Sequence, residues 1–68
     1  MFIVIEIQAT SEESAATINT TYTDYDQACS KYHTILSAAA ISTVWKHSAV
    51  LLREDGILLA RETYTHET

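Results

Sequence analysis

Residues 44–65 read VWKHSAVLLREDGILLARETYT, and this stretch decides how the chain folds. Two apolar runs, residues 44–54 and 57–65, are separated by Asp55 and Gly56. An Asp-Gly pair between apolar runs is the strongest short-range signal of a β-hairpin, since its tight turn requires positive φ angles that glycine adopts readily. The stretch therefore predicts two antiparallel strands joined by a turn.

The pairing within this hairpin depends on the length of its loop. A two-residue loop pairs Leu52 with Leu59 and Val50 with Arg61. A three-residue loop shifts the register by one residue, and such a shift moves side chains to the other face of a sheet. The sequence leaves both registers open.

An amphipathic helix is predicted just before the hairpin, over residues 24–42. Thr23, followed three residues later by Asp26, has the form of a capping box with Thr23 as N-cap. Apolar and small residues then recur at three- and four-residue spacing, which places them on one helix face. We expect five residues of this face to be buried against a sheet: Ala28, Tyr32, Ile35, Leu36 and Ala39.

Two more strands are predicted before the helix. Residues 2–8, FIVIEIQ, are rich in β-branched side chains and favour a central strand, whereas the threonine-rich residues 15–22 favour a polar edge strand. The order β-β-α-β-β predicts a single α+β domain over residues 1–68, with one helix packed on a four-stranded antiparallel sheet. The first and third strands are expected at its centre, giving the strand order 2-1-3-4.

One helix covers only one face of such a sheet, and the first strand is apolar on both faces. In the two-residue register we expect an apolar patch on the uncovered face, made of Phe2, Val4, Val50 and Leu52. A patch of this kind marks a partner surface more often than a solvated one. A chain of 68 residues also buries only about 60% of its unfolded surface. We therefore predict a homodimer that packs face to face, with pairing of exposed edge strands as the second choice.

Composition excludes several classes of protein. The chain is 47% hydrophobic, so it is not a disordered tail, and its one cysteine excludes a disulfide scaffold. The net charge is −5, with only four scattered Lys and Arg residues, which argues against nucleic acid and against anionic membrane surfaces as partners. No stretch approaches the roughly 20 apolar residues of a spanning helix, so we expect a cytoplasmic protein.

The chain carries no recognisable catalytic constellation or glycine-rich phosphate loop, so we expect no enzyme and no cofactor. We predict instead a non-catalytic protein-interaction or assembly module, with a further protein partner possible. The alternative is a small-ligand or metal-binding protein, because two histidines and a carboxylate can bind zinc. In the two-residue register that site would use His47, Glu62, Tyr64 and His66. Ordinary cross-strand packing is the favoured interpretation of these residues, and no metal site is predicted.

Several short segments also carry a family resemblance. They are Ile3–Gln8, Ser30–His33, Leu36–Ala40, His47–Val50 and Tyr64–His66. Together they resemble a group of small uncharacterised proteins from gut Firmicutes and their prophages or mobile elements, over most of the chain. The resemblance implies a bacterial cytoplasmic or phage-encoded protein. It implies no activity, because that group has no assigned function.

Overall fold

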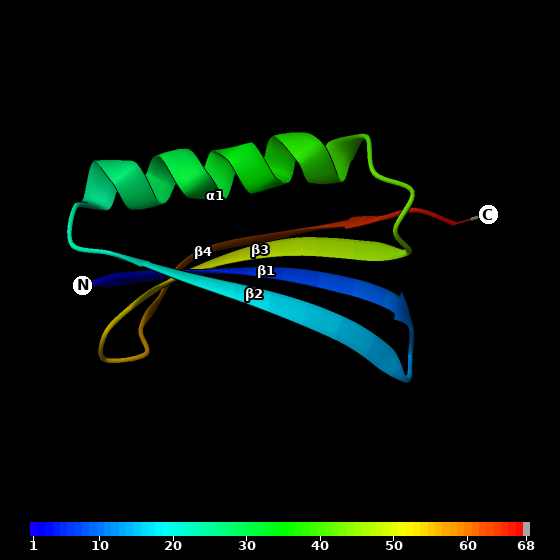
Figure 1. Ribbon diagram of the computed structural model, residues 1–68, viewed down its shortest axis with the longest axis horizontal. Coiled ribbons are helices and arrows are strands. Elements are labelled where there is room, and N and C mark those ends of the chain that lie inside the picture. The colour runs from blue at the N-terminus through cyan, green and yellow to red at the C-terminus, as the bar shows by residue number, and fades with distance from the viewer. Residues whose placement is uncertain (68) are drawn as a thin grey trace.

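The computed structural model describes residues 1–67, in which four strands and one helix are arranged in two layers (Figure 1). The elements are β1 (Phe2–Ser11), β2 (Ser14–Tyr22), α1 (Tyr25–Ala40), β3 (Lys46–Arg53) and β4 (Leu58–Thr65). The strands form one antiparallel sheet in the order β2-β1-β3-β4. The predicted α+β class, element order and strand order are confirmed.

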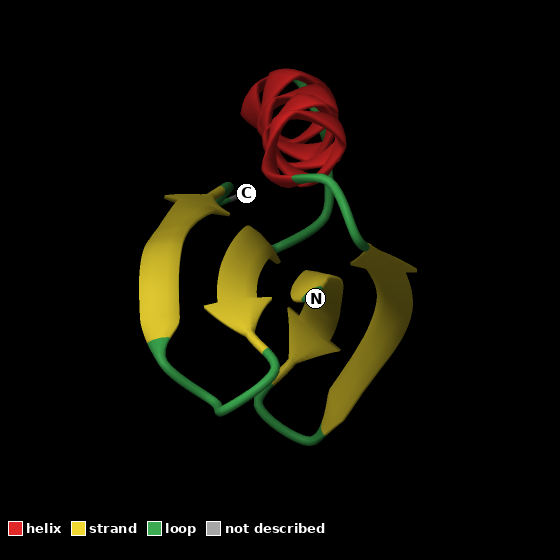
Figure 2. Ribbon diagram, turned by 90° about the vertical axis from the view of Figure 1, so that its left-hand side faces the viewer, coloured by secondary structure: helices red, strands yellow, loops and turns green. Residues whose placement is uncertain are grey.

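The helix α1 covers one face of the sheet, as the end-on view shows (Figure 2). It packs mainly over the central strands β3 and β1, and much less over the edge strands. We call the opposite side, which no element within residues 1–67 covers, the open face. Alternate residues of every strand therefore point toward the helix or toward the open face.

The core lies between α1 and the central strands. Its buried residues are Val4, Ala28, Tyr32, Ile35, Ala49 and Leu51. Ala28 and Ala49 are fully buried, and such small side chains let the helix lie close to the sheet. Of the five helix residues predicted to be buried, four are, whereas Leu36 is half-buried at the margin of this core.

The prediction that Phe2 and Val4 project from the open face is wrong. Val4 is 1% exposed within the core, and Phe2 packs against that core, with its ring centroid 5.3 Å from that of Tyr25. Val4 pairs with Leu51, so these two share the helix-covered face. Val50 and Leu52 alternate with Leu51 and lie on the open face as predicted. The helix covers the face of β1 that also carries Glu6 and Gln8, whereas the all-isoleucine face is left open, so the apolar alternation of β1 did not show where the helix docks.

The N-cap of α1 is Asp24, one residue later than predicted. Its backbone is extended, with φ −101° and ψ 125°, and its Oδ1 accepts a hydrogen bond from the Asp26 backbone N at 2.9 Å. Unlike the neutral hydroxyl of Thr23, a carboxylate at this position also interacts favourably with the positive end of the helix dipole.

Removal of this cap is expected to destabilise the fold. Asp24→Ala should lower the free energy of unfolding by about 1 kcal/mol, because an N–H group of the first turn loses its acceptor. Thr23→Ala is the matched control and should have little effect. Urea unfolding followed by circular dichroism measures both, and an equal loss in the two variants would contradict the assignment of Asp24 as the cap.

The hairpin of β3 and β4 combines the two registers that the sequence left open. Gly56 N donates to Arg53 O at 2.9 Å and Arg53 N to Ile57 O at 3.0 Å, so the loop has three residues and Gly56 adopts φ 85°. Next to this loop Leu52 pairs with Leu58, not with Leu59 as the two-residue loop required.

Beyond the loop, Leu59 is an extra residue in β4, because Leu51 pairs with Ala60. This β-bulge restores the register of the two-residue loop, so that Val50 pairs with Arg61 as predicted. The bulge therefore confines the effect of the longer loop to the end of the hairpin.

Candidate functional site

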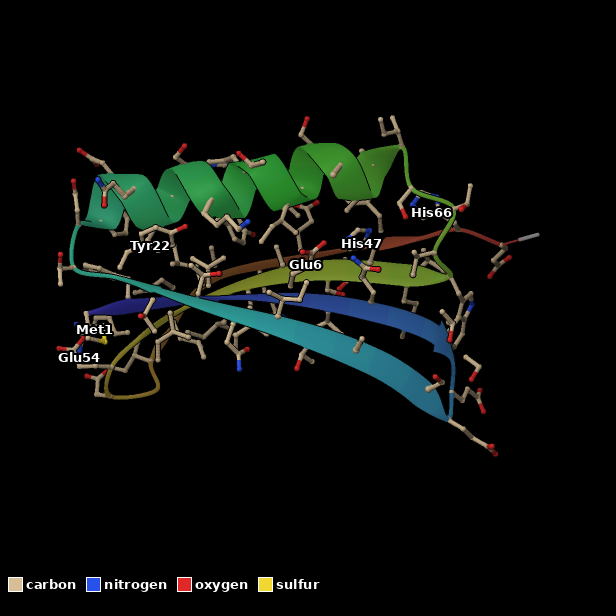
Figure 3. The ribbon with its side chains drawn as sticks, viewed as in Figure 1. Met1, Glu6, Tyr22, His47, Glu54 and His66 are labelled. Atoms are coloured by element: carbon tan, nitrogen blue, oxygen red, sulfur yellow. The ribbon has the colours of Figure 1, made fainter. Side chains whose placement is uncertain are left out.

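A histidine and a carboxylate meet inside the two-layer core. His47 of β3 and Glu6 of β1 both face α1, and His47 Nε2 lies 2.6 Å from Glu6 Oε2 (Figure 3). Their side chains are 5% and 16% exposed. Gln8, which pairs with His47 across the sheet, donates a second hydrogen bond to Glu6 Oε2 at 3.0 Å.

The Glu6 carboxylate is stabilised in its charged form. Burial by itself would raise the pKa of Glu6, but the hydrogen bonds from His47 and Gln8, with the charges of His47 and Lys31, lower it below its ordinary value. Because a carboxylate only accepts, His47 Nε2 carries the shared hydrogen. Among the described residues, His47 Nδ1 is a buried atom without a hydrogen-bond partner. The pair is thus held by its one short contact.

His66 has a separate partner at the end of the helix. Its Nε2 donates to the backbone carbonyl O of Ala39 at 2.7 Å, and its backbone N donates to Trp45 O at 2.7 Å (Figure 3). Ala39 O also accepts from Ser42 N at 3.2 Å, so His66 adds a second hydrogen bond to a carbonyl at the end of the helix. His66 therefore ties the chain after β4 to the end of α1.

The four residues of the alternative metal site do not converge on one centre. His47 contacts Glu6 and not the predicted Glu62, while His66 contacts the helix end. Tyr64 does lie opposite His47, as predicted for the two-residue register. Within residues 1–67, no three His, Cys, Asp or Glu side chains are grouped so that they could hold a metal ion.

Sequence reasoning missed Glu6 as the partner of His47. The two residues are 41 positions apart, and only the pairing of β1 with β3 brings them together. A signal was present, since Glu6 is the one charged residue in the apolar run 2–7. A carboxylate in such a run requires a partner if the run is buried.

The open face carries an apolar stripe along its two central strands. Ile3 pairs with Leu52 and Ile5 with Val50. We define the open-face stripe as five half-buried residues: Ile3, Ile5, Ile7, Val50 and Leu52. All five are apolar, and on β3 the stripe ends at Ser48, which lies opposite Ile7.

Polar residues border most of this stripe. Thr17, Asn19 and Thr21 of β2 lie beside the isoleucines of β1, whereas on β4 Arg61 lies beside Val50 and the apolar Leu58 lies beside Leu52. An apolar centre within a polar rim is the arrangement of protein–protein interfaces. Sequence reasoning placed Val50 and Leu52 here but chose the wrong side of β1.

Comparison with protein-family models, with curated proteins and with solved structures found no match to this chain. The helix described within residues 1–67 does not combine the length and apolar character needed to span a membrane.

Proposed function

We propose that this protein is a non-catalytic protein-interaction or assembly module that forms a homodimer through its open face. The observation that supports this most strongly is the open-face stripe. An antiparallel sheet with one face in water normally shows polar residues there, but the central strands β1 and β3 carry five apolar ones. A second copy of the stripe would remove these side chains from water.

The position of the stripe suits a two-fold interface. It follows the two middle strands, so a two-fold axis through their centre would bring equivalent residues of both copies together. The open-face residues of β2 beside it, Thr17, Asn19 and Thr21, are uncharged and would not repel their counterparts. A 68-residue chain gains little stability from a single layer of core, which makes an additional buried surface favourable.

The histidines support a non-catalytic role. His47 is 4% exposed with its Nε2 committed to Glu6, and His66 is committed to the last turn of the helix. Both contacts join separate elements of the fold, as structural residues do. We propose no cofactor and no metal for this module.

We also propose a bacterial cytoplasmic or phage-encoded protein that binds neither nucleic acid nor membranes. The location rests on the family resemblance given above. We propose no nucleic-acid partner because the basic residues do not form a cluster. Lys46 lies over the Trp45 ring, Arg53 pairs with Asp55, and Arg61 lies on the open face.

A charge placed in the stripe is expected to separate the dimer. Light scattering should give a dimer mass for the unmodified protein at micromolar concentration and a monomer mass for Val50→Glu, because two carboxylates would be buried about the axis. Ala38→Glu adds the same charge on an exposed part of α1 and should remain dimeric. Circular dichroism checks that both variants are folded.

Two outcomes would contradict this proposal. A monomer mass for the unmodified protein would contradict the proposal that it forms a homodimer. A dimer that persists in Val50→Glu would keep the assembly but reject the open face as its interface.

A further inference from the structure

The outer side of β2 is an unprotected sheet edge. Among residues 1–67, β2 pairs only with β1, and alternate residues of an edge strand direct their backbone N–H and C=O groups outward. Natural edges are usually protected by charges, proline or bulges. Residues 15–22, AATINTTY, contain neither charge nor proline, and the irregularity in the pairing with β1 is confined to the turn end, between Ala9 and Ser11.

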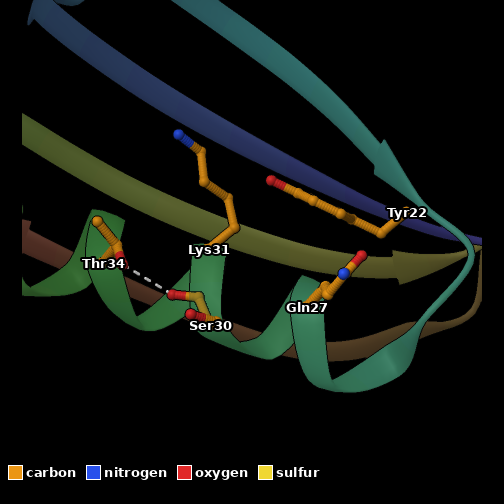
Figure 4. A pocket seen from close by; sticks show the side chains of 5 residues that line it. All are labelled: Tyr22, Gln27, Ser30, Lys31 and Thr34. Atoms are coloured by element: carbon orange, nitrogen blue, oxygen red, sulfur yellow. Dashed lines mark hydrogen bonds between the residues drawn. The ribbon is translucent and has the colours of Figure 1, made fainter.

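A groove lies beside this edge, on the helix side of the sheet. Because α1 packs mainly over β3 and β1, Ile18 of β2 is 56% exposed although it lies on the helix-covered face, opposite Glu6. Near the end of β2 a cavity of about 400 Å³ separates the strand from the helix (Figure 4). Its lining residues are Tyr22, Gln27, Ser30, Lys31 and Thr34. A strand added to β2 would direct alternate side chains toward this groove.

Both ends of the edge are acidic. Glu12 and Glu13 are exposed in the turn before β2, and Asp24 and Asp26 are exposed just after it. Residues 1–30 contain no Lys or Arg that could neutralise them. Lys31 is the cation of the groove, and its charge is the smallest of the effects that lower the pKa of the half-buried Glu6 carboxylate. The edge therefore presents a neutral centre between two negative ends.

We infer that the edge of β2 binds an extended segment of another protein that is uncharged in its middle and carries Lys or Arg at both ends. The segment adds to the sheet as a fifth strand, with backbone hydrogen bonds along β2 and alternate side chains in the groove. This inference names a partner for the proposed interaction function and rests on it, but it uses a surface separate from the open-face stripe.

A second copy of this chain fits the edge poorly. Antiparallel pairing of β2 with its own copy, centred on Ile18, would place Glu12 of one chain opposite Asp24 of the other at both ends. Like charges directly opposed across strands are destabilising. A segment with basic ends turns the same positions into favourable contacts and speeds association at low salt.

Two synthetic peptides test this inference with ¹⁵N-labelled protein. The first is Lys-Lys-Val-Thr-Val-Thr-Val-Lys-Lys, which matches the nine residues of β2 in length, and the second carries Glu in place of every Lys. The basic peptide should shift amide signals of β2 and of the groove. Its dissociation constant should be lower than that of the acidic peptide by about tenfold or more. Salt should weaken its binding.

Matched variants locate the binding surface. Ile18→Lys places a cation at the centre of the edge and should lower the affinity for the basic peptide by about tenfold. Ala38→Lys adds the same charge on exposed helix surface and should leave that affinity unchanged. Amide shifts confined to the other edge, β4, would overturn the inference. So would equal binding of the two peptides, or no shifts at about 1 mM basic peptide.

The test also separates this inference from the proposed homodimer. Val50→Glu should bind the basic peptide as the unmodified protein does, even as a monomer, since the stripe lies on the other face. If the unmodified protein is a dimer but does not bind the basic peptide, the inference about the edge of β2 is wrong and the proposed homodimer stands. If Ile18→Lys instead turned a dimer into a monomer, a second copy would be the occupant and the inference would be wrong.

Discussion

Leu51→Ala is expected to lower the free energy of unfolding by about 3–5 kcal/mol, the upper range for large-to-small changes in a core. Leu51 is 2% exposed, and it lies between Val4 of β1 and Ala60 of β4 beneath the helix. The surrounding sheet cannot close a cavity there without moving the helix. Because a domain of this size has about 5 kcal/mol of stability in total, the variant should keep only about 0–2 kcal/mol and unfold at a much lower urea concentration.

Urea unfolding followed by circular dichroism measures this loss. Leu58→Ala is the matched control, because Leu58 lies in the same hairpin but is 49% exposed, and its replacement should have a much smaller effect. Leu51→Val removes less volume and should give an intermediate loss that remains measurable if Leu51→Ala does not fold. Equal losses at Leu51 and Leu58 would show that the core does not lie where the structure places it.

Glu6→Leu is expected to lower the free energy of unfolding by about 3 kcal/mol, because it leaves the His47 ring buried without its partner. His47 Nδ1 already lacks a hydrogen-bond partner among the described residues, so the loss of the 2.6 Å contact removes the remaining one. Replacing both residues, Glu6→Leu with His47→Leu, should recover part of the loss, since the buried imidazole that had lost its partner is then gone from the core. A double-mutant cycle in urea at pH 7 measures the coupling, and additive single effects would contradict the pair.

Acidification is expected to remove part of the same stabilisation. The folded protein lowers the pKa of Glu6 below its ordinary value of 4.5, so the unfolded chain binds a proton more readily than the folded one. The contribution of Glu6 is therefore fully present above pH 4.5 and is lost as the pH falls through the lower folded pKa. Glu6→Gln cannot titrate, so its stability deficit relative to the unmodified protein should shrink over that range. A deficit independent of pH would show that the carboxylate charge does not stabilise the fold.

The local signals of the sequence were sufficient for the architecture. Asp55 and Gly56 predicted the hairpin, and the three- and four-residue spacing of apolar side chains predicted the helix. Both depend on interactions among neighbours in the chain. The strand order then followed from placing the most apolar strands at the centre.

The side of the sheet that the helix covers could not be predicted in this way. Residues 2–5 of β1 are apolar on both faces, and the polar Glu6 and Gln8 follow on the face of Val4, so hydrophobicity alone did not favour Val4 over Ile5 for the core. The docking side is set by contacts between distant elements, which bury Ala28 of the helix and Ala49 of β3 in the same core. The pair of Glu6 and His47 depends on the same long-range register. The N-cap was misplaced by one residue because Thr23 and Asp24 are both favourable caps.

The bulge at Leu59 has a practical consequence for changing this protein. It absorbs the extra residue of the loop, so the pairing from Leu51 onward is the one that a shorter loop would also produce. The length of residues 54–56 is thereby uncoupled from the alignment of the strands that carry the core and the open face. A change of one residue in the length of this tip is therefore expected to leave both in place. The tip is likewise the position at which a fluorophore or an epitope can be introduced while both proposed binding surfaces keep their geometry.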